Sequence, residues 1–355
     1  PGERNSLSGT MGELRTTHFH AGIDIRTEGR TGLPVHAAAQ GYISRITVSR
    51  GGYGNALYIQ HPNSTTTVYA HLQEFKGPIA DHVREMQYEK QSFELTLYFN
   101  AGEFPVKQGE IVALSGNSGS SGGPHVHFDL RDQNQDLLNP LSYGFDEIPD
   151  RTPPISQKIA VKALDADARV NDRFGRFEYS VRRVGNDYGI DQPIPVYGKI
   201  GLELYAHDRL DYSRFRCGIN LLEVDVDGTG VYGYDISTFA FSEQRNVLRH
   251  MDYEQVLNDR ERFHKLYIDD GNYLRFYSTD ENNGILNLRE TGKKNVLITM
   301  TDSYGNKSTL KFTLDVRPPE SSLEDTSLSA PEWKLTDNIL TVRIPSSDKQ
   351  SSILV

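Results

Sequence analysis

Two short stretches of this chain place histidine and aspartate at spacings that could bind a metal ion. "HFHAGIDIRT" contains His18, His20 and Asp24, and "HVHF" contains His125 and His127. Imidazole nitrogens and a carboxylate oxygen are the ligands that a catalytic Zn²⁺ takes from a protein, with a further position left for water. A site of this kind activates water for hydrolysis.

The "HVHF" stretch has the alternation of a β-strand. Side chains two apart on a strand face the same way, so His125 and His127 share one face while Val126 and Phe128 share the other. A polar strand face that happens to carry two histidines is the plain alternative, and the spacing alone does not decide between the two readings.

The "HFHAGIDI" stretch needs a turn before it can serve as the other half of a site. A fully extended chain would separate His20 from Asp24 by about 13 Å, too far for both to reach one ion at ~2.0–2.2 Å. We therefore expect the chain to turn at Gly22, because glycine adopts dihedral angles that other residues avoid. A histidine from the other strand would complete a three-ligand site with an open fourth position.

Four blocks of this sequence together resemble one known family. "HFHAGIDI", "GYGNALYIQHPN", "VYAHL" and "GNSGSSGGPHVHFDLR" occur in the order and spacing of the M23 metallopeptidases, the lysostaphin and LytM-type peptidoglycan endopeptidases. The resemblance covers residues 17–142. A single H-x-H or H-x-x-x-D would be weak, whereas all blocks in order make a specific signal.

The resemblance implies a role for each matching residue. His20, Asp24 and His127 would bind Zn²⁺, and His71 and His125 would be the catalytic histidines that do not bind the ion. Which of the two takes the proton from water is left open. His18 matches no ligand position and is expected to flank the site.

The resemblance also implies a substrate and a cell compartment. We expect a zinc metalloendopeptidase, an enzyme that hydrolyses peptide cross-links or stem peptides of bacterial peptidoglycan, with the D-alanyl cross-link favoured over glycyl-glycine. The expected location is the periplasm or cell envelope of an exported protein. The chain opens at Pro1 with neither an initiator Met nor a signal segment. We interpret this as a processed chain whose missing N-terminus could carry a lipid anchor.

Two other functions compete with hydrolysis. The first is a catalytically inert M23-like protein that binds the cell wall or activates an amidase. The second is an adhesin or scaffold in which a C-terminal β-sandwich does the work and the peptidase domain is vestigial, since sandwiches host many functions. Bound zinc and product release would separate these from an enzyme.

The elements that must position the site form a mainly β protein. Short apolar strands separated by glycine predict an antiparallel LytM-like β peptidase domain over residues 1–150, with a helix inserted at 79–92. "IPDRTPP" ends that domain. Residues 151–316 are expected to form an immunoglobulin-like β-sandwich closed by a terminal hairpin. Residues 317–355 are linker-like and include one strand candidate, 338–345, that could begin a further module.

Composition excludes several classes of protein. The formal net charge is −10, and both halves of the chain are acidic, so we expect no nucleic-acid partner. Cys217 is the single cysteine, which excludes an intrachain disulfide and a thiolate-rich zinc site. No apolar run is long enough for a transmembrane segment. Eight of the eleven histidines lie within the first 127 residues, where the site is predicted.

Overall fold

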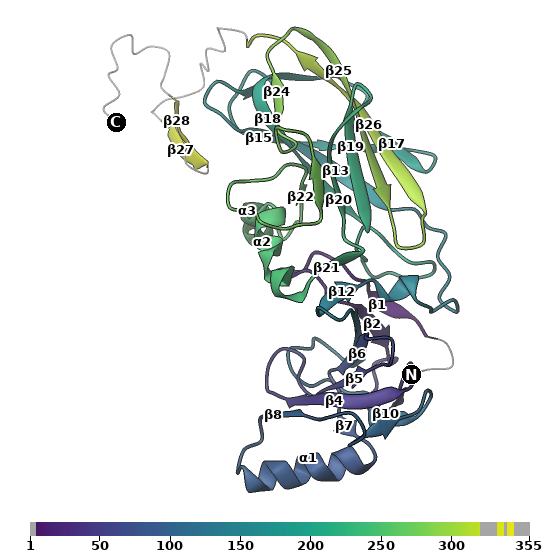
Figure 1. Ribbon diagram of the computed structural model, residues 1–355. Coiled ribbons are helices and arrows are strands. Elements are labelled where there is room, and N and C mark those ends of the chain that lie inside the picture. Colours follow the sequence, from purple (N-terminus) through teal and green to yellow (C-terminus); the bar gives the residue numbers. More distant parts are fainter. Residues whose placement is uncertain (1–4, 320–331, 337–338, 344–355) are drawn as a thin grey trace.

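The computed structural model describes residues 5–319, 332–336 and 339–343 and is mainly β, as predicted. The molecule is elongated (Figure 1). The N-terminal region (residues 5–150) occupies one end, with helix α1 at its tip, and the long strands of the C-terminal region (residues 151–316) occupy the other. Short helical segments lie between the two ends.

The main sheet of the N-terminal region carries the predicted site. Its antiparallel strands run in the order β1-β2-β11-β6-β5-β4-β8, with β9 beside β4 and β12 beside β11. The bounds are β1 Leu7–Gly9, β2 Ile23–Arg26, β4 Gly41–Val48, β5 Ala56–Gln60, β6 Thr66–Ala70, β8 Leu95–Tyr98, β9 Pro105–Val106, β11 His125–Arg131 and β12 Asp136–Leu138. Strands β5 and β6 pair as an antiparallel hairpin.

A small sheet and one helix cover the far end of this region. The sheet has the order β3-β10-β7, with bounds β3 Pro34–His36, β10 Ile111–Leu114 and β7 Glu74–Phe75. Helix α1, Pro78–Glu89, confirms the predicted insertion, and it begins with proline where a missing N–H costs nothing. Its Ile79 and Val83 are buried against the core. Among the described residues no helix has the length and apolar character needed to cross a bilayer.

The C-terminal region is a second strand assembly, built mostly from antiparallel pairs. Its main path is β15-β13-β18-β26-β25-β19-β20-β23, and β26 also pairs in parallel with β17 and β18. The bounds are β13 Ile155–Ala163, β14 Arg169–Val170, β15 Arg176–Ser180, β16 Arg182–Val184, β17 Asp187–Gly189, β18 Ile194–His207, β19 Leu221–Val226, β20 Thr229–Asp235, β22 His264–Lys265, β23 Tyr277–Thr279, β24 Leu286–Leu288, β25 Gly292–Thr301 and β26 Lys307–Val316. The predicted terminal hairpin is confirmed as β25 with β26. The immunoglobulin-like assignment stays a prediction.

Short helical turns join the two regions. The bounds are η1 Pro140–Ser142, η2 Phe241–Asn246, α2 Val247–His250 and α3 Tyr253–Asp259. The last three follow one another within residues 241–259. Asp252 caps α3 by accepting hydrogen bonds from the first backbone N–H groups of that helix.

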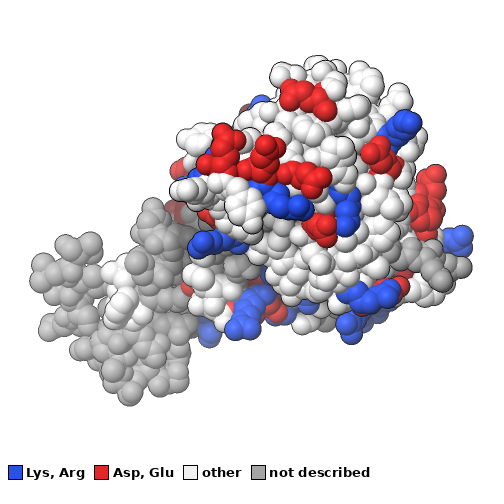
Figure 2. All heavy atoms as spheres, turned by 90° about the horizontal axis from the view of Figure 1, so that it is seen from below, with Lys and Arg blue, Asp and Glu red and all other residues white. Residues whose placement is uncertain are grey.

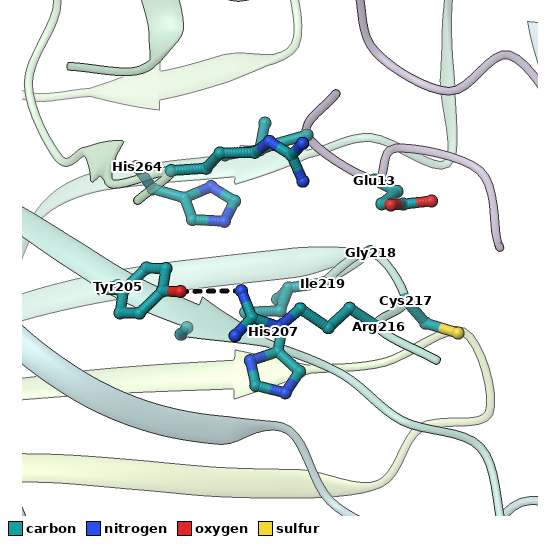
Figure 3. A pocket seen from close by; sticks show the side chains of 11 residues that line it. Glu13, Tyr205, His207, Arg216, Cys217, Gly218, Ile219 and His264 are labelled. Carbon is teal, nitrogen blue, oxygen red and sulfur yellow. Dashed lines mark hydrogen bonds between the residues drawn. The ribbon is translucent and has the colours of Figure 1, made fainter. Parts of the chain in front are cut away.

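Backbone pairing connects segments on either side of residue 150, where we predicted a domain boundary. The boundary stays a prediction. Strand β21, Thr238–Ala240, joins the N-terminal sheet beside β12. Met11 and Phe19 pack into the core of the C-terminal region. A small hollow of about 30 Å³ lies at this junction, lined by Glu13 of the N-terminal region and by residues of the C-terminal region that include Tyr205 and His207 (Figure 3). The two regions therefore form a close interface.

One further pair of strands lies near the C-terminus. Strands β27, Glu332–Thr336, and β28, Ile339–Arg343, pair with each other, and β28 falls on the predicted strand 338–345. Residues 320–331 of the predicted linker lie outside the described residues. On the face drawn in Figure 2, acidic and basic side chains are interspersed among uncharged ones.

Candidate metal centre and active site

Three neighbouring strands bring the predicted ligands together. β11 lies between β2 and β6, and the register places His127 directly opposite Asp24 on one side and Ala70 on the other. Opposed residues on neighbouring strands have closely spaced side chains. His20 lies three residues before β2, and His71 directly follows β6. All four polar side chains therefore reach the same end of the sheet.

The ligand atoms of three residues converge on one point. His20 Nε2 lies 3.0 Å from Asp24 Oδ1 and 3.0 Å from His127 Nδ1, and His127 Nδ1 lies 2.9 Å from Asp24 Oδ1. All three side chains are buried. Among the described residues, the group at this point that could hold a metal ion consists of these three alone.

Gly22 is needed for a different reason from the one we predicted. Its φ is not in the left-handed region, so the bend between His20 and Asp24 does not depend on that property of glycine. A Cβ at this position would lie 2.0 Å from the carbonyl oxygen of Phe128. Gly22 therefore permits the close backbone approach of this segment to β11.

Outer hydrogen bonds determine which ring nitrogens face the centre. His20 Nδ1 lies 2.9 Å from the carbonyl oxygen of Thr10. His127 Nε2 lies 2.6 Å from Asp129 Oδ1. A carbonyl and a carboxylate only accept, so these ring nitrogens carry the protons and donate. In the neutral rings, the nitrogens that face Asp24 Oδ1 are then lone-pair acceptors. Three acceptors at this separation fit a cation between them.

Arg15 holds the other oxygen of Asp24. Its guanidinium contacts Asp24 Oδ2 and lies 3.1 Å from Glu13 Oε2. A charge-assisted hydrogen bond of this type orients the carboxylate. Asp24 therefore presents a single oxygen, Oδ1, to the two imidazoles.

Burial and charge set the protonation of the three ligands. Burial opposes the charge of Asp24, but His20 and the hydrogen bonds from the surrounding histidines hold its pKa well below its usual value. Burial and Arg15 lower the pKa of His20 to about 4, so this ring is neutral at neutral pH. Burial also disfavours charge on His127, but the carboxylate of Asp129 outweighs it and raises the pKa to about 9.

His71 and His125 lie beside this centre and are oriented alike. His71 Nδ1 donates to the carbonyl oxygen of Ser118 at 2.8 Å, and His125 Nδ1 donates to that of Gly123 at 2.8 Å. The two ring centroids are 4.7 Å apart. Each neutral ring keeps Nε2 as an acceptor. The Nε2 atom of His125 is buried without a hydrogen bond and lies 3.4 Å from Asp24 Oδ1.

Burial, with smaller contributions from the neighbouring His127 and His125, lowers the pKa of His71 to about 3. The backbone of His71 has φ 58°, in the left-handed region that few non-glycine residues adopt. Such conformations are kept where the surrounding structure over-determines them, often at functional sites. His18 is not part of the centre, since its Nδ1 contacts the hydroxyl of Thr17.

Three residues of the site were absent from our predictions for it. Asp129 and Arg15 contact the ligands directly, and Tyr53 donates from its hydroxyl to Asp129 Oδ2 at 2.8 Å. A signal for Asp129 was present, because it continues the alternation of His125 and His127 along the strand. Arg15 lies in an irregular segment that has no such signal.

Comparisons with known proteins match the N-terminal part of this chain to one peptidase family. Residues 18–88 match the model of peptidase family M23. The DD-carboxypeptidase/endopeptidase Mpg of Neisseria meningitidis is 32% identical over 155 residues, which is 44% of this chain and 29% of that protein. An uncharacterized metalloprotease of Haemophilus influenzae is 32% identical over 123 residues, 35% of this chain and 20% of that protein. The chain thus spans less than a third of the length of these relatives.

A solved structure, the catalytic domain of a mutant of the prophage-encoded M23 protein EnpA from Enterococcus faecalis, is 27% identical. The match covers 41% of this chain and 95% of that one, with a TM-score of 0.31. At that score the assignment depends on the family model and the sequence relatives. The chain contains a peptidase M23 domain.

Proposed function

We propose that this chain is a zinc-dependent endopeptidase that cleaves peptide bonds in bacterial peptidoglycan. The observation that carries the proposal is the convergence of three buried acceptor atoms, on His20, Asp24 and His127, within 4.8 Å of one another. Beside them, His71 and His125 each have a ring nitrogen free to accept a proton. Metal-catalysed hydrolysis requires metal ligands and proton-transfer groups close together, and this site has both.

The residues that would hold the ion are His20 through Nε2, Asp24 through Oδ1 and His127 through Nδ1. Zn²⁺ held there would supply Lewis acidity, polarising a peptide carbonyl and lowering the pKa of water toward neutrality. Among the described residues no fourth side chain joins the group, which suits a catalytic site rather than a structural one. Arg15 and Asp129 fix the orientation of the ligands.

The proton steps belong to His71 and His125. Because each donates its Nδ1 proton to a backbone carbonyl, each ring presents Nε2 to the site. One Nε2 accepts a proton from the attacking water and then delivers it to the leaving amine. The other ring, once protonated, donates to the developing oxyanion. The hydrogen bonds orient the two rings in the same way, so the assignment of the two steps is left to experiment.

The proposed substrate is the D-alanyl peptide cross-link of peptidoglycan. The name of the Neisseria relative, DD-carboxypeptidase/endopeptidase, supports cleavage after a D-residue. Lipoprotein NlpD of Yersinia enterocolitica, 28% identical over 115 residues, supports a location in the cell envelope. We propose that the C-terminal region, as an immunoglobulin-like sandwich, orients the M23 domain through the pairing of β12 with β21.

Digestion of purified sacculi tests this proposal. The zinc-loaded protein should release soluble fragments whose masses identify cleavage at the D-alanyl cross-link. A chelator should stop the release, and restored Zn²⁺ should recover it. His125→Ala, which leaves the three ligands in place, is the matched inactive control. Release of fragments by the chelated protein, or no release by the zinc-loaded one, would contradict the proposal.

A further inference from the structure

A second group of buried ligand-type side chains lies at the junction of the two regions. Asp150, Asp208 and Asp302 each offer a carboxylate oxygen within 4.8 Å of the others. Their exposed fractions are 8%, 2% and 4%. Asp150 ends the N-terminal region, Asp208 directly follows β18, and Asp302 directly follows β25. Three carboxylates therefore meet from three distant segments.

Part of this group is without hydrogen-bond partners. Asp208 Oδ1 is fully buried and has none, and the same holds for Asp150 Oδ2. Asp302 is better satisfied, since its Oδ1 accepts from the backbone N–H of Tyr304 at 2.8 Å and its Oδ2 accepts from the side chain of Asn306 at 2.8 Å. A buried polar atom without a partner costs the full desolvation of the group. A cation between the carboxylates would give these two oxygens a partner.

The charges around Asp208 are of one sign. Burial, together with the neighbouring Asp302 and Asp150, raises its pKa to about 8, against the hydrogen bond from a backbone N–H that lowers it. Burial and Asp302 also raise the pKa of Asp150 to about 7, against a hydrogen bond from Thr152. Among the residues that the structure describes, no basic side chain is among the groups that shift the pKa of Asp208.

We propose that Asp150, Asp208 and Asp302 bind a calcium ion that fastens the junction between the N-terminal and C-terminal regions. Hard cations prefer oxygen ligands, and this group offers carboxylate oxygens without nitrogen or sulfur. Calcium tolerates an irregular set of oxygens completed by water, whereas magnesium demands near-octahedral geometry. The ion would neutralise the shared negative charge and give both orphan oxygens a partner.

The contacts of the group show what the ion would hold in place. Asp208 forms a two-way backbone bridge with Cys217, whose side chain packs in the core of the N-terminal region. The next residue, Gly218, donates its backbone N–H to the hydroxyl of Thr10 at 2.9 Å. The carbonyl of Thr10 in turn accepts from His20. The calcium site is thus linked through the backbone of one loop to the segment that supports a zinc ligand.

Calcium binding by the zinc-loaded full chain is the direct test. Equilibrium dialysis with ⁴⁵Ca²⁺ should give one ion per chain. The melting temperature should rise by about 3–10 °C in about 10 mM CaCl₂, a concentration above the roughly 10⁻⁴–10⁻³ M range of extracellular calcium modules. The same concentration of MgCl₂ should produce a smaller rise.

Two variants separate this site from the zinc site. Asp208→Asn should lose the ion and the calcium-dependent rise, yet in calcium-free buffer it should melt no lower than the unmodified protein, because it replaces a carboxyl whose ionisation is opposed by burial and by the neighbouring aspartates. Asp24→Asn should lose zinc and keep the calcium response. No bound calcium and no rise in melting temperature in the unmodified protein would overturn the proposal. An undiminished response in Asp208→Asn, or a larger response to magnesium than to calcium, would also overturn it.

Discussion

Each region of the molecule buries a pair of histidines within hydrogen-bonding distance. In the N-terminal region, His20 Nε2 and His127 Nδ1 are 3.0 Å apart, and we call these residues the metal-site pair. In the C-terminal region, His250 Nε2 and His264 Nδ1 are 2.9 Å apart, and we call these the core pair. The nitrogen–nitrogen distances of the two pairs are nearly equal, so the distance between imidazoles does not distinguish them.

The partners of the two pairs are different. The metal-site pair faces the carboxylate of Asp24 and is anchored by that of Asp129. The core pair contacts neutral hydroxyls, with Tyr277 at 2.9 Å from His250 and Tyr234 at 3.3 Å from His264. A carboxylate favours positive charge between the rings, whereas a phenol in an apolar core does not.

The pKa values follow this difference. Asp129 outweighs burial and raises the pKa of His127 to about 9, whereas burial lowers that of His264 to about 3. One pair therefore attracts a cation and the other excludes it. The core pair instead supports the site by packing, because the ring of Phe19, next to His20, lies 5.5 Å from that of His250. In this chain the carboxylate of Asp24 distinguishes the metal-site pair from the core pair.

The largest expected effect comes from exchanging one histidine in each pair for glutamine. His127→Gln should lose zinc and all hydrolytic activity, because it removes one of three ligands. His264→Gln should retain about one zinc per chain, because no ligand depends on it directly. Elemental analysis after dialysis measures both. Equal zinc loss in the two variants would show that the pairs do not differ as described.

The next effect separates ligands from proton carriers within the N-terminal region. His71→Ala and His125→Ala should each keep zinc, and turnover of a cross-linked peptide should fall by about 10²–10⁴-fold. Their Nδ1 atoms contact backbone carbonyls and not the ligand group, so the metal should remain bound. Full turnover in His125→Ala would refute its assigned role.

A smaller effect is expected from the carboxylate that anchors the metal-site pair. Asp129→Asn should weaken zinc binding by about 10–100-fold, because an amide holds the ring of His127 less firmly than a carboxylate. Tyr53→Phe is the matched control, since it removes a hydrogen bond to the other oxygen of Asp129 and should change the zinc Kd less. Competition with a chelating dye gives both values. An unchanged Kd in Asp129→Asn would mean that the anchor has no influence on the metal.

The smallest effect concerns the core pair and pH. The folded pKa of His264 lies below the unfolded value of 6.5, so folding favours the neutral ring. That stability is complete above pH 6.5 and is lost as the pH falls from there toward about 3. The free energy of unfolding, measured with urea, should fall between pH 6 and pH 4 in the unmodified protein. In His264→Gln this fall should be smaller by about 1.4 kcal/mol per pH unit. Parallel slopes would show that the ring is not buried in its neutral form.

Much of the site could be predicted because its residues lie on regular elements. The alternation along β11 predicts that His125 and His127 share a face, and the structure brings both to Asp24. The same alternation extends to Asp129, which we did not use. The need for Gly22 was foreseen, but its physical reason was wrong, since no local pattern shows how closely two backbones approach.

Other features depend on contacts between distant segments. The pairing of β12 with β21 joins residues about a hundred positions apart. The sequence of neither strand predicts which strand it pairs with. The core pair is brought together by the turns of α2 and α3 and not by any ligand-like spacing. The group of Asp150, Asp208 and Asp302 has no motif at all. Tertiary structure alone creates such sites.

Zinc-edge anomalous diffraction from crystals of the zinc-loaded protein tests the central claim most directly. The account predicts one strong peak within bonding distance of His20 Nε2, Asp24 Oδ1 and His127 Nδ1, with water completing the coordination. No peak between these atoms, or an ion there already saturated by a fourth side chain, would contradict it.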